Sequence, residues 1–261
     1  MPEPERLQAD AELLFDAVHQ AGSLAMTMLR QDVRRWSKPD GTPVTEADIK
    51  VDALLAGMLC ARRPTYGWLS EESPGDQTRT SRDYCWIVDP IDGTRAFSLG
   101  RSQWCVAAAL VFRGRPVLSA VYQPVPELFY AAILGDGAKL NGKAIMAEDG
   151  ASLADAKVIG NRKSISPLLV DGISADQSGD LPLLLRLAHV ASGQVAAAVS
   201  VGPKNDWDLA AGDLLVHEAG GLVTDLDGSA FKLNRQFTWQ NGMVAGGKVR
   251  HGLALERLRE L

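Results

Sequence analysis

Apolar residues recur at helical spacing near the start of the chain. From Asp10 to about Gln31 they stand three or four positions apart, which predicts one amphipathic helix. A second helix is predicted to begin at Thr45, because Thr45 and Asp48 have the spacing of a capping box and an apolar series of the same period follows. The run of turn formers between the two helices, residues 38–43, predicts a loop or the tip of a hairpin.

The middle of the chain has short apolar runs separated by polar turns, the pattern typical of strands. Strands or extended segments are predicted at residues 66–70, 86–88, 104–112, 117–122 and 128–133, with a further hairpin at 135–142 and a polar loop at 73–83. The later runs are joined by short turns, so neighbouring strands are predicted to pair as an antiparallel meander.

Beyond residue 152 predicted strands alternate with predicted helices. The strands lie at residues 157–160, 195–201, 222–225 and 242–245, and the helices at 181–192, 208–219 and 253–261. The expected fold is therefore α/β, with two closely packed lobes. Residues 1–150 would form an antiparallel sheet lobe with helices, and residues 151–261 a mixed α/β lobe.

The composition narrows the class of protein. The 261 residues are 46% hydrophobic and 23% charged, which is ordinary for a globular protein. A net charge of −5 argues against broad binding to nucleic acid or to an anionic membrane, and no apolar run approaches the ~20 residues that span a bilayer. The N-terminus does not resemble a signal peptide, and Cys60, Cys85 and Cys105 stand singly, as expected of reduced thiols. We therefore expect a soluble, cytoplasmic protein without nucleic-acid or membrane partners.

One turn brings together groups that suit metal and phosphate chemistry. The strand at 86–88 runs directly into Asp89-Pro90-Ile91-Asp92-Gly93-Thr94. Pro90 favours an extended conformation in the residue before it, so the strand is expected to end at Asp89 and the chain to turn there. Gly93 permits a close backbone approach, and Thr94 can begin a helix whose free N–H groups face an anion. Two carboxylates beside such amides suit a divalent metal and a phosphate.

Each acidic residue also has a purely structural explanation. Asp-Pro and Asp-Gly pairs are ordinary turn formers. Asp48 can simply cap the second helix or can orient a water at a site, and Asp208 can cap the helix predicted at 208–219. Adjacent side chains of an extended segment point to opposite sides, so only one of Glu71 and Glu72 is expected to face a common site.

Taken together, the acidic segments resemble a known family. Residues 86–94, with Glu71-Glu72 upstream and Trp207-Asp208-Leu209-Ala210-Ala211-Gly212 downstream, are similar in order and spacing to the inositol monophosphatase superfamily, and residues 45–48 match a fourth segment. The resemblance covers nearly the whole chain. It implies a layered α-β-α-β-α sandwich, Mg²⁺-dependent hydrolysis of a small phosphorylated metabolite, inhibition by lithium and, frequently, a homodimer.

The resemblance also implies which residues hold metal. One Mg²⁺ would be held by Glu71, Asp89 and the carbonyl of Ile91, and a second would lie between Asp89, Asp92 and Asp208. A third, weaker ion would be held by Glu71 and waters. Two or three ions would offset the four carboxylates, which explains how an acidic protein could bind phosphate.

Catalytic roles follow from the same resemblance. Thr94 with Asp48 would orient or deprotonate the attacking water, and Glu71 would complete the catalytic group. The amides of Gly93 and Thr94 would hold phosphate oxygens as charge shifts in the transition state. No covalent phosphoenzyme is expected.

Differences from the family point to the substrate. Arg95 follows the turn where inositol monophosphatases usually have Thr-Asn-Phe, and a basic residue there resembles the bacterial 3′(2′),5′-bisphosphate nucleotidases. By an ungapped count Ser200 replaces an inositol-binding glutamate of animal enzymes, and residues 180–183 replace a Gly-Thr/Ser-Ala segment. Arg95 and Lys204 could meet a second phosphate. We therefore favour a nucleotidase acting on 3′-phosphoadenosine 5′-phosphate; the alternatives are an inositol or sugar monophosphatase and, remotely, a non-catalytic regulatory protein.

Overall fold

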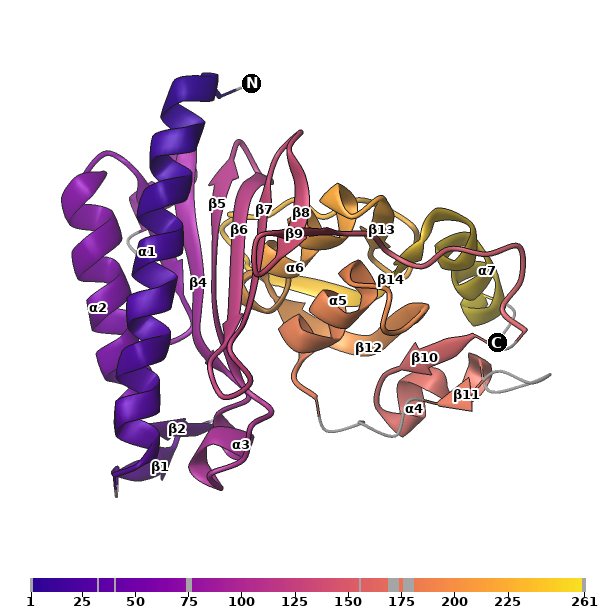
Figure 1. Ribbon diagram of the computed structural model, residues 1–261, viewed down its shortest axis with the longest axis horizontal. Helices are drawn as coiled ribbons and strands as arrows, with labels where there is room; N and C mark the ends of the chain where they lie inside the picture. The colour runs from indigo at the N-terminus through magenta and orange to yellow at the C-terminus, as the bar shows by residue number, and fades with distance from the viewer. Residues whose placement is uncertain are drawn as a thin grey trace.

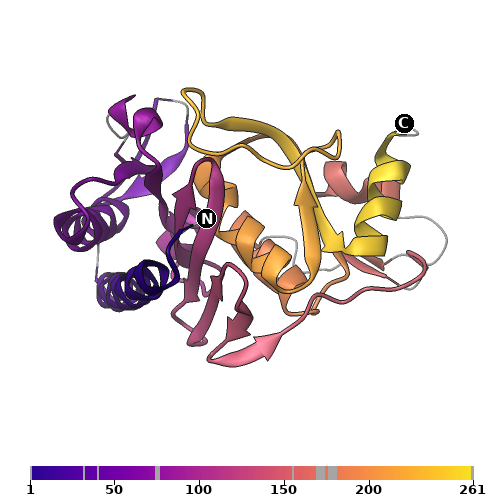
Figure 2. The same ribbon diagram turned by 90° about the horizontal axis from the view of Figure 1, so that it is seen from above.

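Helices and sheets alternate in layers across the molecule (Figures 1 and 2). The computed structural model describes residues 2–31, 33–39, 41–73, 77–154, 156–168, 174–175 and 181–259. Helices α1 (Pro4–Leu29) and α2 (Glu46–Arg62) cover one face of a seven-stranded sheet, and α5 (Leu183–Ala191) and α6 (Asp206–Glu218) lie between this sheet and a five-stranded one. On the far side lie α7 (Lys248–Arg259) and the one-turn α4 (Arg162–Ile165) with the short η2 (Ser166–Leu168). The predicted α-β-α-β-α sandwich is confirmed.

The seven-stranded sheet follows the chain in order, β3-β4-β5-β6-β7-β8-β9. Its strands are β3 (Gly67–Ser70), β4 (Tyr84–Asp92), β5 (Cys105–Phe112), β6 (Arg115–Gln123), β7 (Leu128–Ile133), β8 (Gly137–Leu140) and β9 (Lys143–Ile145). From β4 onward all neighbours are antiparallel, so the predicted meander is confirmed. Strand β3 is parallel to β4, which the spacing of the strands did not predict.

A small hairpin precedes this sheet. Strands β1 (Arg35–Ser37) and β2 (Pro43–Thr45) pair antiparallel around the turn formers, as predicted. Of the predicted polar loop at 73–83, residues 77–81 form the short helix η1 (Gln77–Ser81), and residues 74–76 lie outside the described part of the chain.

The five-stranded sheet is mixed, with the order β11-β10-β12-β14-β13. Its strands are β10 (Lys157–Ile159), β11 (Ser174–Ala175), β12 (Ala197–Asn205), β13 (Gly221–Thr224) and β14 (Trp239–Gly247). Strand β12 continues past its predicted end at residue 201, because a register shift between Ser200 and Pro203 lets it resume pairing with β14. Helix α7 begins five residues earlier than predicted, at Lys248. The Asp149 carboxylate accepts the amides of Val249 and Arg250 there, a cap supplied from far away in the sequence.

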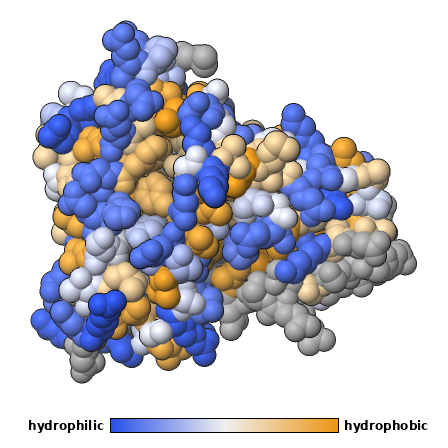
Figure 3. Space-filling view, viewed as in Figure 1, coloured by the Kyte–Doolittle hydropathy of each residue, from blue (hydrophilic) through white to orange (hydrophobic). Residues whose placement is uncertain are grey.

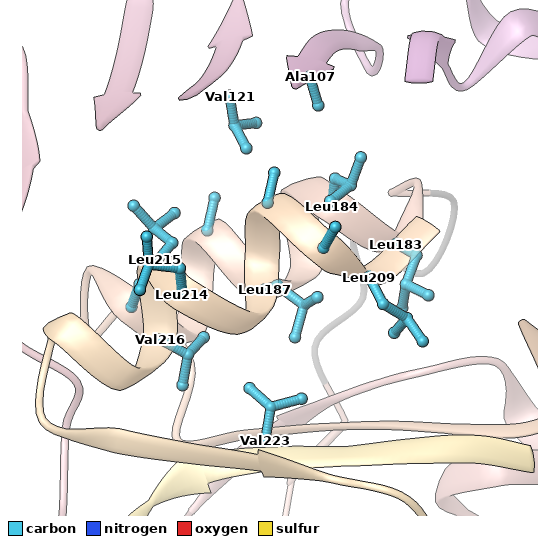
Figure 4. Packing of buried hydrophobic residues seen from close by; sticks show 14 of the residues in the cluster. Ala107, Val121, Leu183, Leu184, Leu187, Leu209, Leu214, Leu215, Val216 and Val223 are labelled. Atoms are coloured by element: carbon cyan, nitrogen blue, oxygen red, sulfur yellow. The ribbon is translucent and has the colours of Figure 1, made fainter. Parts of the chain in front are cut away.

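The largest hydrophobic core lies between the two sheets, around α5 and α6. In Figure 4, Ala107 and Val121 of the first sheet and Val223 of the second enclose leucines of both helices, such as Leu187 and Leu215. The core thus draws on both halves of the chain, and a boundary at residue 150 stays a prediction. On the outer face seen in Figure 3, polar and apolar side chains are interspersed over α1 and α2. Within the described residues, no helix is long and apolar enough to cross a membrane.

Close packing of α5 on α6 depends on Gly212. A Cβ atom placed there would lie 2.7 Å from the Cβ of Leu187, well inside van der Waals contact. The neighbouring carbonyl of Ala211 accepts a 2.6 Å hydrogen bond from the Ser119 hydroxyl, which ties α6 to β6. Gly212 thus lets α5 approach α6 closely.

Replacing Gly212 by Ala should therefore destabilise the fold. The added methyl group overpacks the contact with Leu187, at an expected cost of about 1–3 kcal/mol in the free energy of unfolding. Gly57 is the matched control, since it also lies inside a helix but a Cβ there meets nothing within 4 Å. Gly57→Ala should stabilise by roughly 0.5–1 kcal/mol. Urea unfolding of both variants tests this, and equal effects at the two sites would contradict the packing argument.

Candidate active site

The acidic turn at the end of β4 is built around a bulge. The prediction that this strand ends at Asp89 is wrong, because β4 continues to Asp92. Asp89 pairs with Ala107 and Asp92 with Cys105, so the register shifts between them and Pro90 falls in the irregular part, where the ladder does not need its missing N–H. The bulge changes the direction of the chain without ending the strand, and both carboxylates stay at this end of β4.

Gly93 forms the sharp corner that the sequence predicted. Its φ of 100° lies in the left-handed region, and a Cβ there would lie 2.7 Å from the carbonyl oxygen of Gln103. The short helix α3 (Thr94–Ser98) starts directly after it. The Thr94 hydroxyl lies 2.9 Å from Oδ1 of Asp48 and 3.1 Å from the carbonyl oxygen of Ile91, and it can donate to either. Thr94 therefore joins the corner to the start of α2.

Asp48 caps α2 and also reaches the acidic corner, while its role in orienting a water stays a prediction. Its Oδ2 accepts hydrogen bonds from the backbone N–H and the hydroxyl of Thr45, which completes the capping box of α2. Its Oδ1 accepts from Thr94 at the acidic corner. The side chain is only 1% exposed, and burial raises the pKa of its carboxyl group.

Asp208 uses the same device at the start of α6. The helix begins at Asp206, two residues earlier than predicted, and Asp208 is its third residue. Oδ2 of Asp208 accepts a 2.7 Å hydrogen bond from the amide of Asn205 in a second capping box. Burial raises the pKa of Asp208 to about 6. Oδ2 of Asp92 in turn accepts the amide of Leu184, in the first turn of α5, at 2.7 Å.

Lys38 is a site residue that sequence reasoning missed. Its ammonium lies 3.0 Å from Oε1 of Glu71 and 2.7 Å from Oε1 of Glu72. The expectation that only one of the two glutamates faces a common group is wrong, because β3 ends at Ser70 and both stand in a bend where strand alternation does not apply. Burial raises the pKa of Glu72 to about 7 even beside Lys38. Lys38 reaches the two glutamates only when the β1–β2 hairpin folds. The turn formers around it in the sequence do not indicate this contact.

The carboxylates share one buried region of negative charge. Burial, followed by the charges of Asp92, Glu71 and Asp208, holds the pKa of Asp89 well above its ordinary value. Burial and the charge of Asp208 raise the pKa of Asp92 to about 7. Oδ1 of Asp89 is buried and has no hydrogen-bond partner. Lys38 pairs with only one of these four carboxylates, Glu71.

The present side-chain positions do not form a closed metal cage. Within the described ranges, no three or more His, Cys, Asp and Glu side chains are arranged so that they could hold an ion. Glu71, Asp92 and Asp208 instead accept hydrogen bonds from Lys38, the amide of Leu184 and the amide of Asn205. A cation would have to draw these side chains away from their present donors.

Residues predicted to contact the substrate lie in different surroundings. Arg95 is exposed on α3, next to Thr94. Lys204 is half-buried on β12, where its ammonium donates to the carbonyl of Pro203 and its charge acts to lower the pKa of Asp208. Ser200 is 3% exposed in the same strand. Residue 180, from the segment expected to line the pocket, lies outside the described residues. Contact of these residues with a substrate stays a prediction.

The structure resembles solved phosphatases along nearly its whole length. It superimposes with a TM-score of 0.85 on an IMPase/NADP phosphatase complexed with Mg²⁺ and phosphate, at 25% identity, over 97% of this chain and 95% of that one. The two structures thus share the layered α-β-α-β-α fold. The model of the inositol monophosphatase family matches residues 7–261, and the chain belongs to this family.

Relatives within the family have different names. The inositol-1-monophosphatase of Mesorhizobium japonicum is 34% identical over 230 residues, which are 84% of each chain. The 3′(2′),5′-bisphosphate nucleotidase CysQ of Shigella flexneri is 33% identical over 207 residues, 74% of this chain and 80% of that protein. The Nus factor SuhB of Pasteurella multocida is 31% identical over 220 residues, 76% of this chain and 78% of that protein. Identity to these three is similar, so it does not select a substrate.

Proposed function

We propose that the protein is a Mg²⁺-dependent phosphomonoesterase that acts on a small phosphorylated metabolite. The observation that carries this proposal is the group of Asp89, Asp92 and Asp208 beside Glu71, in which Asp89 is buried and its Oδ1 has no hydrogen-bond partner. Carboxylate and carbonyl oxygens are the ligands that Mg²⁺ prefers. The donor set therefore fits the metal, and family membership supports the same chemistry.

The proposed ligand sets follow the elements of the fold. Glu71 at the end of β3, Asp89 and the Ile91 carbonyl of β4 would hold one ion, and Asp92 and Asp208 would share a second with Asp89. A third ion would lie at Glu71. When bound, the ions would supply positive charge that attracts the phosphate, and they would acidify the attacking water.

The remaining steps depend on the chain's own groups. Because the Thr94 hydroxyl can donate to Asp48, its oxygen lone pairs are free to accept a hydrogen bond from water. Thr94 would thus orient the water and Asp48 would receive its proton, with Glu71 on the same side. The amides of Gly93 and Thr94, at the start of α3, would hold the phosphate oxygens as negative charge moves in the transition state. The alcohol would leave on the opposite side, in line with the water.

Among substrates we favour 3′-phosphoadenosine 5′-phosphate over an inositol or sugar phosphate. Arg95, exposed beside the proposed phosphate site, and Lys204, near Asp208, are the two cations that could meet a second phosphate. CysQ among the relatives supports this choice, and the inositol-1-monophosphatase supports the alternative. Inhibition by lithium, a homodimer and a cytoplasmic location are proposals that rest on the family resemblance.

The substrate preference can be measured directly. The ratio kcat/KM for 3′-phosphoadenosine 5′-phosphate should exceed that for inositol 1-phosphate, because only the nucleotide offers Arg95 and Lys204 a second phosphate. Phosphate release from both, side by side at saturating Mg²⁺, tests this. A preference of more than about tenfold for inositol 1-phosphate, equal to ~1.4 kcal/mol, would reverse the order.

Asp92→Asn should abolish phosphate release and leave the fold intact. The change removes one negative charge from the proposed second metal site while its amide oxygen can still accept from Leu184, so we expect kcat to fall by about 100-fold or more. The matched control is Asp136→Asn in the exposed β7–β8 turn, which should keep full activity. The near-ultraviolet circular dichroism of both variants should match that of the wild type. Phosphate release that survives in Asp92→Asn would show that the site is assigned wrongly, whereas a wild-type protein that releases no phosphate would favour the non-catalytic alternative.

Lys38→Met should lower the Mg²⁺ concentration that gives half-maximal activity. The Lys38 ammonium occupies an oxygen of Glu71 that the proposed ion needs, so its removal leaves two carboxylates without a competing cation. We expect a decrease of about three- to tenfold. Lys139→Met removes an exposed lysine that pairs with Asp136 and serves as the control. An increased Mg²⁺ requirement in Lys38→Met would show that Lys38 assists the site rather than competes for it.

A further inference from the structure

A pocket of about 560 Å³ has Glu71 in its lining but none of Asp89, Asp92 and Asp208. It is bounded by the end of β3, by η1, by the first turn of α6 and by the segment that leads into β14. Its lining includes Leu69, Gln77, Thr80, Trp207, Gln236 and Thr238. A pocket of this volume is large enough for a ligand of nucleoside size.

A hydrogen-bond network fixes the walls of this pocket. The Arg79 side chain, 6% exposed, donates to Oδ1 of Asn234 at 2.6 Å and to the carbonyl of Arg235 at 3.0 Å. The amide of Asn234 donates to Asp206 at 2.7 Å, and Gln240 donates to the other Asp206 oxygen at 2.8 Å. These contacts join η1, the start of α6 and the β14 segment. The pocket is therefore preformed, and a ligand need not order its walls.

An aromatic side chain, Trp207, lines the pocket. Trp207 and Leu69 supply apolar surface in the lining. The indole of Trp207 offers a face on which a flat ring can stack.

The polar side chains of the lining determine which hydrogen-bonding groups a bound ring should carry at its edge. Gln77 and Gln236 carry carboxamides, which pair with the donor and acceptor groups of an adenine edge. Thr80 and Thr238 add hydroxyl groups. Glu71 and Arg79 contribute one charge of each sign, so the lining does not favour an anion. The chemistry fits a neutral heteroaromatic ring with attached hydroxyl groups.

We propose that this pocket is a second small-molecule site and that it binds an adenine nucleoside. The site goes beyond the proposed function. Glu71 belongs to the side of the attacking water, and in-line displacement puts the leaving group on the opposite side, so the pocket does not hold the alcohol of the substrate. The pocket and the acidic corner adjoin at Glu71 and at Trp207, but Asp89, Asp92 and Asp208 are not part of the pocket lining.

Binding is tested with adenosine, which carries no phosphate, by calorimetric titration of the full chain without added metal. One adenosine should bind per chain. The double variant Gln77→Ala/Gln236→Ala, altered only at exposed side chains, should bind about tenfold more weakly because two hydrogen-bonding groups are lost. Thr80→Trp, which fills the pocket, should abolish binding, and Gln194→Ala, an exposed glutamine beyond the end of α5, should change nothing.

A second arm separates this pocket from the catalytic site. Adenosine should bind equally to Asp92→Asn, and excess inorganic phosphate with Mg²⁺ should not displace it. No binding up to the solubility of adenosine, or equal affinity in the double variant, would overturn the proposal. Displacement by phosphate with Mg²⁺ would place adenosine at the acidic corner and would overturn it as well. The result is independent of whether the protein hydrolyses phosphate esters.

Discussion

Repulsion among buried carboxylates is the constraint on which the rest of the site depends. Asp89, Asp92 and Asp208 lie in one buried region with Glu71 nearby, and each carboxylate raises the cost of ionising its neighbours. A fold gains nothing in stability from such a cluster, since burying unpaired charge is expensive. Clusters of this kind are typical of functional sites, and the proposed metal centre would supply the missing positive charge.

The fold holds these groups with ordinary local devices. Asp48 and Asp208 are each the third residue of a helix, and one carboxylate oxygen of each accepts the hydrogen bond of a capping box. The cap fixes the carboxylate, and in Asp48 the second oxygen remains for Thr94. Asp92 is fixed by an amide at the start of α5, and the β4 bulge sets the spacing between Asp89 and Asp92. Helix starts therefore position the acidic site as well as the helices themselves.

Local sequence pattern predicted most helices and strands and the turn after Asp89, whereas the layered sandwich was implied by the family resemblance. The meander, the β1–β2 hairpin and the capping box of Asp48 each arise from neighbouring residues. Lys38 could not be predicted, since only the folded hairpin brings it to Glu71. The start of α7 was missed for the same reason, as its cap comes from Asp149. The strand was expected to end before Pro90, because proline has no N–H to pair. The bulge leaves Pro90 outside the paired positions, so the strand continues.

Two interpretations of the acidic corner, a set of helix caps and a metal centre, make different demands on its side chains. If caps were its whole purpose, a divalent ion would leave Glu71, Asp92 and Asp208 with their present donors. The most direct measurement is a crystal of the protein soaked in Mn²⁺, with anomalous diffraction recorded at the manganese edge. We predict at least two peaks between the Asp89 corner and Asp208, with Asp89 touching both ions and Glu71 released from Lys38. If the protein releases phosphate in solution but its soaked crystals show no anomalous density in this region, the metal-centre account is contradicted.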